Sequence, residues 1–273
     1  MKISTSAIGE SETVTSNWQW QHWEGMPYLT CNLLQEWQHG FFSRQFYPRS
    51  PETLVKILHP NAKVYRVQQV HGNKVLLPTE IEAAMSEEDS NTNLPPADGI
   101  VTDGKQQAVW VAGADCTPVL IGDVISGKVG AVHAGWRGTA QKIVPEAIGH
   151  FLSSGSSLDN LRIAMGPAIN GKIYQVSEFV AAEIGASIVS VDRKEAVLEA
   201  MWELADSPLL EDSQPGRVRL DVRRVNEIQI EQLGIGKQQI SIAPFCTYQQ
   251  EEYFFSYRRT NQKKVQWSGI VSK

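Results

Sequence analysis

Seven short runs rich in β-branched and aromatic residues most constrain what this chain of 273 residues can fold into. They lie at 63–70, 74–77, 108–112, 118–121, 128–133, 161–165 and 239–243. Such runs, bounded by turn-forming residues, are typical of β-strands. Helical periodicity is limited to 139–152, 177–188, 193–205 and 221–233. Because strands and helices do not alternate strictly, the sequence predicts an α+β fold of mixed β-sheets flanked by helices.

Local signals refine these elements. Asp221 can cap the start of the last helix and Gly234 can end it. Pro145 removes an internal hydrogen bond from the first helical pattern, so that helix is expected to be kinked there or to begin later. Four tryptophans fall within the first 37 residues. We interpret them as a Trp-rich strand or hairpin over a sheet, in preference to an aromatic ligand platform.

No internal repeat or long linker divides the chain, so a single domain spanning 1–273 is expected. The most polar stretch, 86–96, contains two adjacent prolines and is predicted to be an exposed loop. Cys31, Cys116 and Cys246 are odd in number and widely spaced, which does not fit a disulfide framework.

Charge and hydropathy exclude several classes of protein. Lys+Arg number 25 and Asp+Glu 30, a formal charge of −5, which offers no basic field for nucleic acid. No run reaches the roughly 18–20 apolar residues needed to cross a bilayer, and 1–17 lacks the layout of a signal peptide. We therefore expect a cytoplasmic monomer or homodimer without nucleic-acid or membrane partners.

Three segments, 68–73, 113–118 and 132–139, place His71, Cys116 and His133 beside glycine turns at the ends of predicted strands. The separations of 45 and 17 residues are too long for a zinc finger. If the three residues converge, they form a Cys/His/His set that leaves a fourth position for water, the arrangement of catalytic zinc. The alternative is that Cys116 is a small buried hydrophobe and the histidines are satisfied strand-end residues. Spacing alone leaves both interpretations open.

Other residues near these segments are candidates for binding or proton transfer. Gly135, Arg137 and Gly138 lie in a loop that leads into a helix, which favours a phosphate site beside His133 as much as a plain tight turn. Arg44 is a similar isolated candidate for anion binding. Asp115, next to Cys116, is expected to act as an acid/base group or to fix a ligand imidazole.

The remaining acids and arginines have simpler interpretations. Asp98 and Asp103 could also act as acid/base groups or hold a ligand imidazole, but each precedes a glycine and we favour their interpretation as turn formers. Arg258 and Arg259 offer two guanidiniums and are candidates like Arg44; the alternative for all three is a surface salt bridge.

Six motifs together resemble a known family. In chain order they are Gln-Val-His-Gly, Ala-Asp-Gly-Ile-Val-Thr-Asp, Ala-Asp-Cys-Thr-Pro-Val, Gly-Ala-Val-His-Ala-Gly-Trp-Arg-Gly-Thr, Met-Gly-Pro-Ala-Ile and Phe-Phe-Ser-Tyr-Arg-Arg. The chain resembles, from about 41 to 257, the family named after multicopper polyphenol oxidases or laccase-domain proteins. Members of that family are now mostly described as zinc-dependent purine nucleoside phosphorylases.

The resemblance implies a single α+β domain with Zn²⁺ held by His71, Cys116 and His133. It implies phosphorolysis of adenosine, inosine, guanosine and 5′-methylthioadenosine to base and ribose 1-phosphate, with deamination of adenosine as a second activity. The chain departs from the family pattern at 45–50, where a glycine-rich turn is usual. Gln175 stands where a glutamate is common, and the segment after Arg259 lacks the usual Gly-Arg pattern.

Three alternatives remain at this stage. A multicopper oxidase needs more histidines than the six present, although a single Cu²⁺ can replace Zn²⁺ in a His/Cys/His site and support polyphenol oxidation. Cys116 as nucleophile with His133 as base would make a metal-free hydrolase, inactivated by thiol alkylation but not by chelators. Relatives have also been linked to quality control of cell-wall precursors, for which the sequence provides no discriminating feature.

Overall fold

The computed structural model describes residues 17–86, 94–191, 193 and 196–273. Its first sheet has six strands, in the order β1-β2-β3-β15-β7-β4. Their bounds are Trp18–Trp23, Met26–Cys31, His39–Phe42, Gln266–Val271, Gln107–Gly113 and Lys63–Tyr65. The second sheet has the order β14-β10-β8-β9-β6-β5. Those strands span Ile240–Ile242, Leu161–Met165, Thr117–Asp123, Val129–Ala134, Gly99–Val101 and Val75–Leu76.

A third, three-stranded sheet has the order β11-β13-β12, with bounds Gln175–Ser177, Arg217–Leu220 and Leu209–Leu210. The helices are α1 (Pro51–Leu58), α2 (Pro78–Ser86), α3 (Trp136–Ala140), α4 (Ile143–Ser153), α5 (Glu178–Gly185), α6 (Ala196–Trp202), α7 (Val222–Gln232) and α8 (Tyr257–Thr260). Each large sheet contains both parallel and antiparallel pairs, such as β4 with β7 and β15 with β7. The predicted α+β fold with mixed sheets is therefore confirmed.

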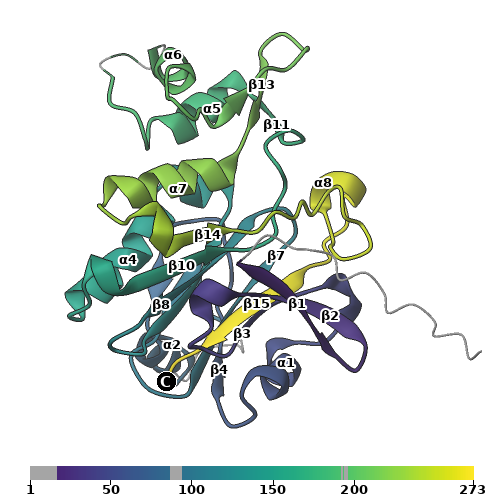
Figure 1. The fold of residues 1–273 in the computed structure, drawn as a ribbon, viewed down its shortest axis with the longest axis vertical. Helices are drawn as coiled ribbons and strands as arrows, with labels where there is room; N and C mark the ends of the chain where they lie inside the picture. Colours follow the sequence, from purple (N-terminus) through teal and green to yellow (C-terminus); the bar gives the residue numbers. More distant parts are fainter. Residues whose placement is uncertain (1–16, 87–93, 192, 194–195) are drawn as a thin grey trace, which may run out of the picture.

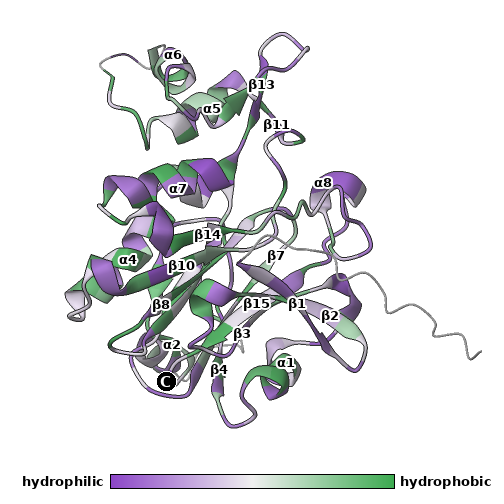
Figure 2. Cartoon of the chain, in the orientation of Figure 1, coloured by the Kyte–Doolittle hydropathy of each residue, from purple (hydrophilic) through white to green (hydrophobic). Residues whose placement is uncertain are grey.

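The two large sheets pack against each other, with helices on their outer faces (Figure 1). Because side chains alternate along a strand, each strand serves two cores. Val109 and Val111 of β7 join the core between the sheets, whereas Trp110 joins the cluster beneath α1. On β8, Leu120 faces the central core and Val119 joins the cluster beneath α4. Figure 2 shows the resulting contrast between apolar strands and the polar outer sides of the helices.

A smaller unit formed by the third sheet, α5 and α6 extends from this body (Figure 1). It has its own apolar cluster, which includes Ala181, Ile184, Met201 and Leu220. Helix α7 contributes Val225 to that cluster and Ile230 to the cluster beneath α4. The helix thus joins the small unit to the sheet body.

All seven predicted strands are present; β10 has the predicted bounds, and the other six differ at one or both ends. The largest difference is β4, which ends at Tyr65, so the segment leading to His71 is irregular. The helical pattern 139–152 forms two helices, because the chain turns at Lys142, whose φ is 60°. Pro145 lies in the first turn of α4, where its missing N–H costs no helical bond.

The other predicted helices and the tryptophan-rich hairpin are also observed. The side chain of Asp221 accepts from the backbone N–H groups of Arg223 and Arg224 at the start of α7, and Gly234 has a φ of 98° beyond its end. Strands β1 and β2 pair over their full length, and the ring of Trp18 packs 5.4 Å from that of Phe41. The Trp-rich hairpin is thus present, as the edge of the first sheet.

Within the described residues, no helix combines the length and apolar character needed to cross a membrane. The predicted polar loop at 86–96 and the expected domain limits 1–273 fall partly outside the described residues.

Candidate metal centre

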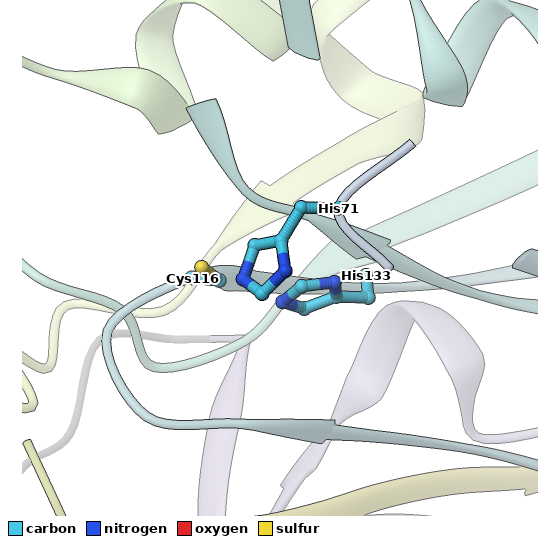
Figure 3. A group of neighbouring side chains, drawn as sticks. All are labelled: His71, Cys116 and His133. Carbon is cyan, nitrogen blue, oxygen red and sulfur yellow. The ribbon is translucent and has the colours of Figure 1, made fainter. Parts of the chain in front are cut away.

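His71, Cys116 and His133 lie together, with one ligand atom from each within 4.8 Å of the others. Figure 3 shows the two imidazoles beside the sulfur atom, each arriving from a different chain segment. The imidazole centroids are 4.9 Å apart, with an angle of 80° between the ring planes. Three residues separated by 45 and 17 positions in sequence therefore form one cluster.

Sheet register explains this convergence. Strands β8 and β9 are antiparallel, with Pro118 opposite His133, so Cys116 lies just before β8 and close to the end of β9. His71 belongs to the irregular segment between β4 of the first sheet and β5 of the second. The cluster thus forms where the chain crosses from one sheet to the other.

Asp98 holds two of these residues in place, and its interpretation as a simple turn former is wrong. Its fully buried carboxylate accepts from His133 Nδ1 at 2.8 Å and from the backbone N of His71 at 2.9 Å. The backbone N–H groups of Val70 and Gly72 also donate to it, at 3.1 and 2.8 Å. Three successive N–H groups around one anion stabilise the left-handed conformation of His71, whose φ is 61°. Asp103, by contrast, is the predicted turn acid, bonded to Thr79 and Gln107.

The cluster favours a thiolate. Burial opposes ionisation of Cys116, but His133 and His71 outweigh it and lower the pKa of the thiol to about 6. Burial also opposes protonation of His133, yet the Cys116 thiolate and the Asp98 carboxylate raise its pKa to about 9. Without a metal, the half-buried Cys116 and the buried His133 therefore form a thiolate–imidazolium pair.

The donor set fits a metal ion with one thiolate and two imidazole ligands. Asp98 occupies Nδ1 of His133, which leaves Nε2 as the donor and fixes the ring, as second-shell carboxylates do in zinc sites. Three protein donors of this kind suit Zn²⁺ with an open position, and also Cu²⁺. A metal held by His71, Cys116 and His133 would supply Lewis-acid chemistry at that open position.

Two glycines give the cluster its space. A Cβ at Gly135 would lie 3.0 Å from Cys116 Sγ, 3.3 Å from His71 Cδ2 and 3.7 Å from His133 Cε1. A Cβ at Gly138 would lie 2.8 Å from the carbonyl oxygen of Gly72, in the segment that carries His71. Gly135 and Gly138, predicted as phosphate-binding residues, are thus packed against the cluster itself.

The cluster borders a cavity of about 500 Å³. Other described residues that line it are Val67, Gln69, Ala112, Gly113, Ala114, Tyr257, Gln262, Lys263, Lys264, Val265 and Trp267. The Gln69 amide exchanges two hydrogen bonds with the backbone of Ala112, which fixes one wall to β7. A ligand in this cavity would meet apolar and aromatic surface on one side and the candidate ligands on another.

Asp115 does not hold a ligand imidazole. Its carboxylate accepts from Thr247 Oγ1 at 2.6 Å, Ser256 Oγ at 3.1 Å and the backbone N of Arg258 at 2.7 Å. These bonds tie the loop that carries Cys116 to the C-terminal segment that forms another cavity wall. Asp98, rather than Asp115, fixes a ligand imidazole.

The candidate arginines have different environments. Arg137 is exposed, and its guanidinium lies 4.4 Å from the centroid of the Trp136 ring. Arg44 donates to the carbonyl oxygen of Glu251 and lies over the ring of Phe255, and it does not line the cavity. Arg258 lies over Tyr174, and Arg259 donates to the carbonyl groups of the loop 247–254. The predicted surface salt bridge exists for Arg44 and Arg259, both with Glu251.

Comparison with known proteins identifies the family to which this chain belongs. The chain belongs to the family described as multi-copper polyphenol oxidoreductase laccase, whose model matches residues 49–272. A Synechocystis relative called purine nucleoside phosphorylase slr1573 is 53% identical over 259 residues, which cover 93% of this chain and 97% of the relative. Purine nucleoside phosphorylase ORF3 of Streptomyces griseus is 31% identical over 72% of this chain and 70% of its own length. The crystal structure of YlmD from Geobacillus stearothermophilus superposes with a TM-score of 0.76 at 22% identity, covering 93% of this chain and 98% of that one.

Proposed function

We propose that this protein is a zinc-dependent purine nucleoside phosphorylase that cleaves adenosine, inosine, guanosine and 5′-methylthioadenosine to base and ribose 1-phosphate. The observation that carries the proposal is the position of the His71, Cys116 and His133 cluster on a cavity of about 500 Å³. That volume lies within the usual range of small-molecule sites, roughly 300–1,000 Å³. The relatives named purine nucleoside phosphorylase support the assignment of the substrate class.

Phosphorolysis requires an anion held beside a sugar that becomes cationic as the glycosidic bond breaks. We assign phosphate binding to Arg137 in the loop from Gly135 to Gly138, next to His133. Within the described part of the chain, no carboxylate lies within the 4.0 Å ion-pair distance of the Arg137 guanidinium, so its charge is available. Deamination of adenosine to inosine is proposed as a second activity of the same centre, because zinc sites with an open position also serve hydrolytic deamination.

The test is chromatography of the products from inosine and adenosine, with and without phosphate, using protein purified without added metal. We expect phosphate-dependent release of free base from inosine, and formation of inosine from adenosine. Cys116→Ala and His133→Ala should lose bound metal and both activities together. Cys246→Ser is the matched control, because Cys246 is a buried thiol outside the cluster and serine retains an acceptor for the backbone N of Asn170.

The same experiment separates the other candidate functions. The thiolate of Cys116 beside His133 also fits a nucleophilic hydrolase, which would retain activity after metal removal. Absence of base and inosine from metal-replete protein would contradict the phosphorylase proposal and favour that thiol mechanism. Phenol oxidation only after copper loading would indicate metal substitution, because Cu²⁺ displaces Zn²⁺ from such donors.

A further inference from the structure

The charge of the cavity beside the metal centre differs from that of the chain as a whole. The chain has a formal charge of −5, yet the described residues that line this cavity include Lys263 and Lys264 and neither aspartate nor glutamate. A second cavity of about 480 Å³ provides an internal comparison. Its lining balances three acids against three bases, namely Asp206, Asp221, Glu227, Lys172, Arg223 and Arg224. The lining of the cavity at the metal centre is thus positive, whereas that of the second cavity is balanced.

The two carboxylates that hold the metal centre and its loop have partners other than these lysines. Asp98 is surrounded by four donors and Asp115 by three, all of them within the protein. Within the described ranges, neither lysine forms an ion pair with a carboxylate. The Lys264 ammonium lies 5.8 Å from the ring centroid of Tyr47, a contact that leaves its charge intact. Two lysines without an ion pair among the described residues therefore line the cavity.

The segment that carries the lysines is fixed at both ends. The Gln266 side chain accepts from the backbone N of Phe255 and donates to the carbonyl oxygen of the same residue, which closes the loop 256–265 at its base. Asp115 holds the first part of this loop through Ser256 and Arg258, and β15 begins directly after it. The lysines are thus part of a cavity wall tied to the loop of Cys116.

The metal centre itself adds no net charge to this cavity. A divalent ion bound by one thiolate and two neutral imidazoles would retain one positive charge, which the Asp98 carboxylate beside His133 balances. The lysines therefore carry the excess positive charge. Ammonium groups bind phosphate as point charges, and a cavity lined by one sign of charge concentrates ligands of the opposite sign. An uncharged nucleoside alone leaves these charges without a counterion.

We propose that Lys263 and Lys264 form an anion subsite that binds a phosphoryl group at the rim of this cavity. The phosphoryl group is either the inorganic phosphate that attacks the sugar or a phosphate carried on the 5′ position of a purine nucleotide. This inference rests on the proposed function for the nature of the ligand. The lysines then determine whether the substrate class extends from nucleosides to nucleotides.

The test measures binding to metal-replete protein by isothermal titration calorimetry, with inorganic phosphate, inosine 5′-monophosphate and uncharged inosine as separate probes. Binding is independent of turnover, so failure of the phosphorylase assignment does not affect the result. The variants are Lys263→Gln, Lys264→Gln and the double variant. Lys105→Gln is the matched control, because Lys105 is exposed in the turn that precedes β7, whereas the cavity lies at the other end of that strand.

We expect the double variant to bind at least one anionic probe tenfold or more weakly, with inosine binding unchanged and a reduced dependence on ionic strength. Loss with inorganic phosphate identifies the co-substrate site, and loss with inosine 5′-monophosphate alone identifies a 5′-phosphate site. The proposal is overturned if both anions bind the double variant as tightly as Lys105→Gln, or if inosine binding weakens equally. Absence of binding of either anion to the unaltered protein also overturns it.

Discussion

Asp98 Oδ1 lies 2.8 Å from His133 Nδ1, and the backbone N of His133 donates to the carbonyl oxygen of Asp98 at the same distance. The reciprocal contact arises because β6 and β9 are antiparallel neighbours with Gly99 opposite Val132. The same carboxylate accepts from the backbone N of His71. One buried acid thus fixes the positions of two proposed ligands from different parts of the chain.

Replacing Asp98 by asparagine should weaken metal binding while the chain stays folded. An amide cannot neutralise the His133 ring or accept from all four donors, and loss of such outer-shell partners typically costs roughly 10- to 100-fold in metal affinity. Metal retention against a competing chelator measures the effect. Asp103→Asn is the matched control, since Asp103 follows in the same motif but bonds only to Thr79 and Gln107. Equal metal retention by the two variants would contradict the role of Asp98.

Gly135→Ala should weaken metal binding by crowding the cluster. The new methyl group would lie 3.0 Å from Cys116 Sγ and 3.3 Å from His71 Cδ2, so at least one ligand must move. Gly149→Ala in α4 meets nothing within 4 Å and should instead stabilise the helix by up to about 1 kcal/mol. Metal content and urea unfolding of both variants give the comparison. Normal metal content in Gly135→Ala would show that the ligand geometry is wrong.

Cys116 should be the most reactive thiol of the metal-free protein. Its pKa of about 6 makes it largely thiolate at pH 7, so alkylation should slow as the pH falls through about 6. Burial instead raises the pKa of Cys31, and Cys246 is buried. Mass spectrometry after treatment with iodoacetamide identifies the modified residue, and added Zn²⁺ should protect it. Protection of Cys31 or Cys246 in place of Cys116 would rule out Cys116 as the ligand.

Arg137→Ala should raise the KM for phosphate and leave deamination of adenosine unchanged. The guanidinium is exposed and lies over the Trp136 ring, so its removal should not disturb the fold. Loss of one charge-assisted contact to phosphate corresponds to roughly 1.5–3 kcal/mol, or about 10- to 100-fold in KM. Initial rates at varied phosphate, beside the deaminase rate, provide the measurement. An equal fall in the phosphorolysis and deamination rates would show that Arg137 does not act specifically on phosphate.

His39 should make the protein less stable in mild acid. Burial lowers its pKa from 6.5 to about 4, although its hydrogen bonds to Trp37 and Cys31 oppose the shift. The unfolded chain therefore takes up the proton first, and the free energy of unfolding falls between pH 6.5 and 4, by roughly 3 kcal/mol. Urea unfolding at several pH values should show a smaller fall for His39→Gln. His22→Gln, at an exposed position, should behave like the unaltered protein.

The sequence by itself determined the elements whose signals are local. Short runs of β-branched and aromatic residues identify strands such as β7 and β8, and the cap at Asp221 identifies α7, because these signals depend on neighbours only a few residues away. The chemical character of His71, Cys116 and His133 beside glycines also indicated which residues to consider as ligands. Strand β15 went unpredicted, because its Ser-Gly pair weakens the strand pattern and its place depends on pairing with β3 and β7.

Only the tertiary structure decided which of the chemically similar residues form the site. Asp98 and Asp103 share the same Asp-Gly context, yet β6 and β9 bury the first beside His133 and leave the second in a turn. Lys263 and Lys264 gain their place only because Asp115 and Gln266 hold their loop over the cavity. Such differences come from contacts between residues far apart in sequence, so local sequence patterns do not predict them.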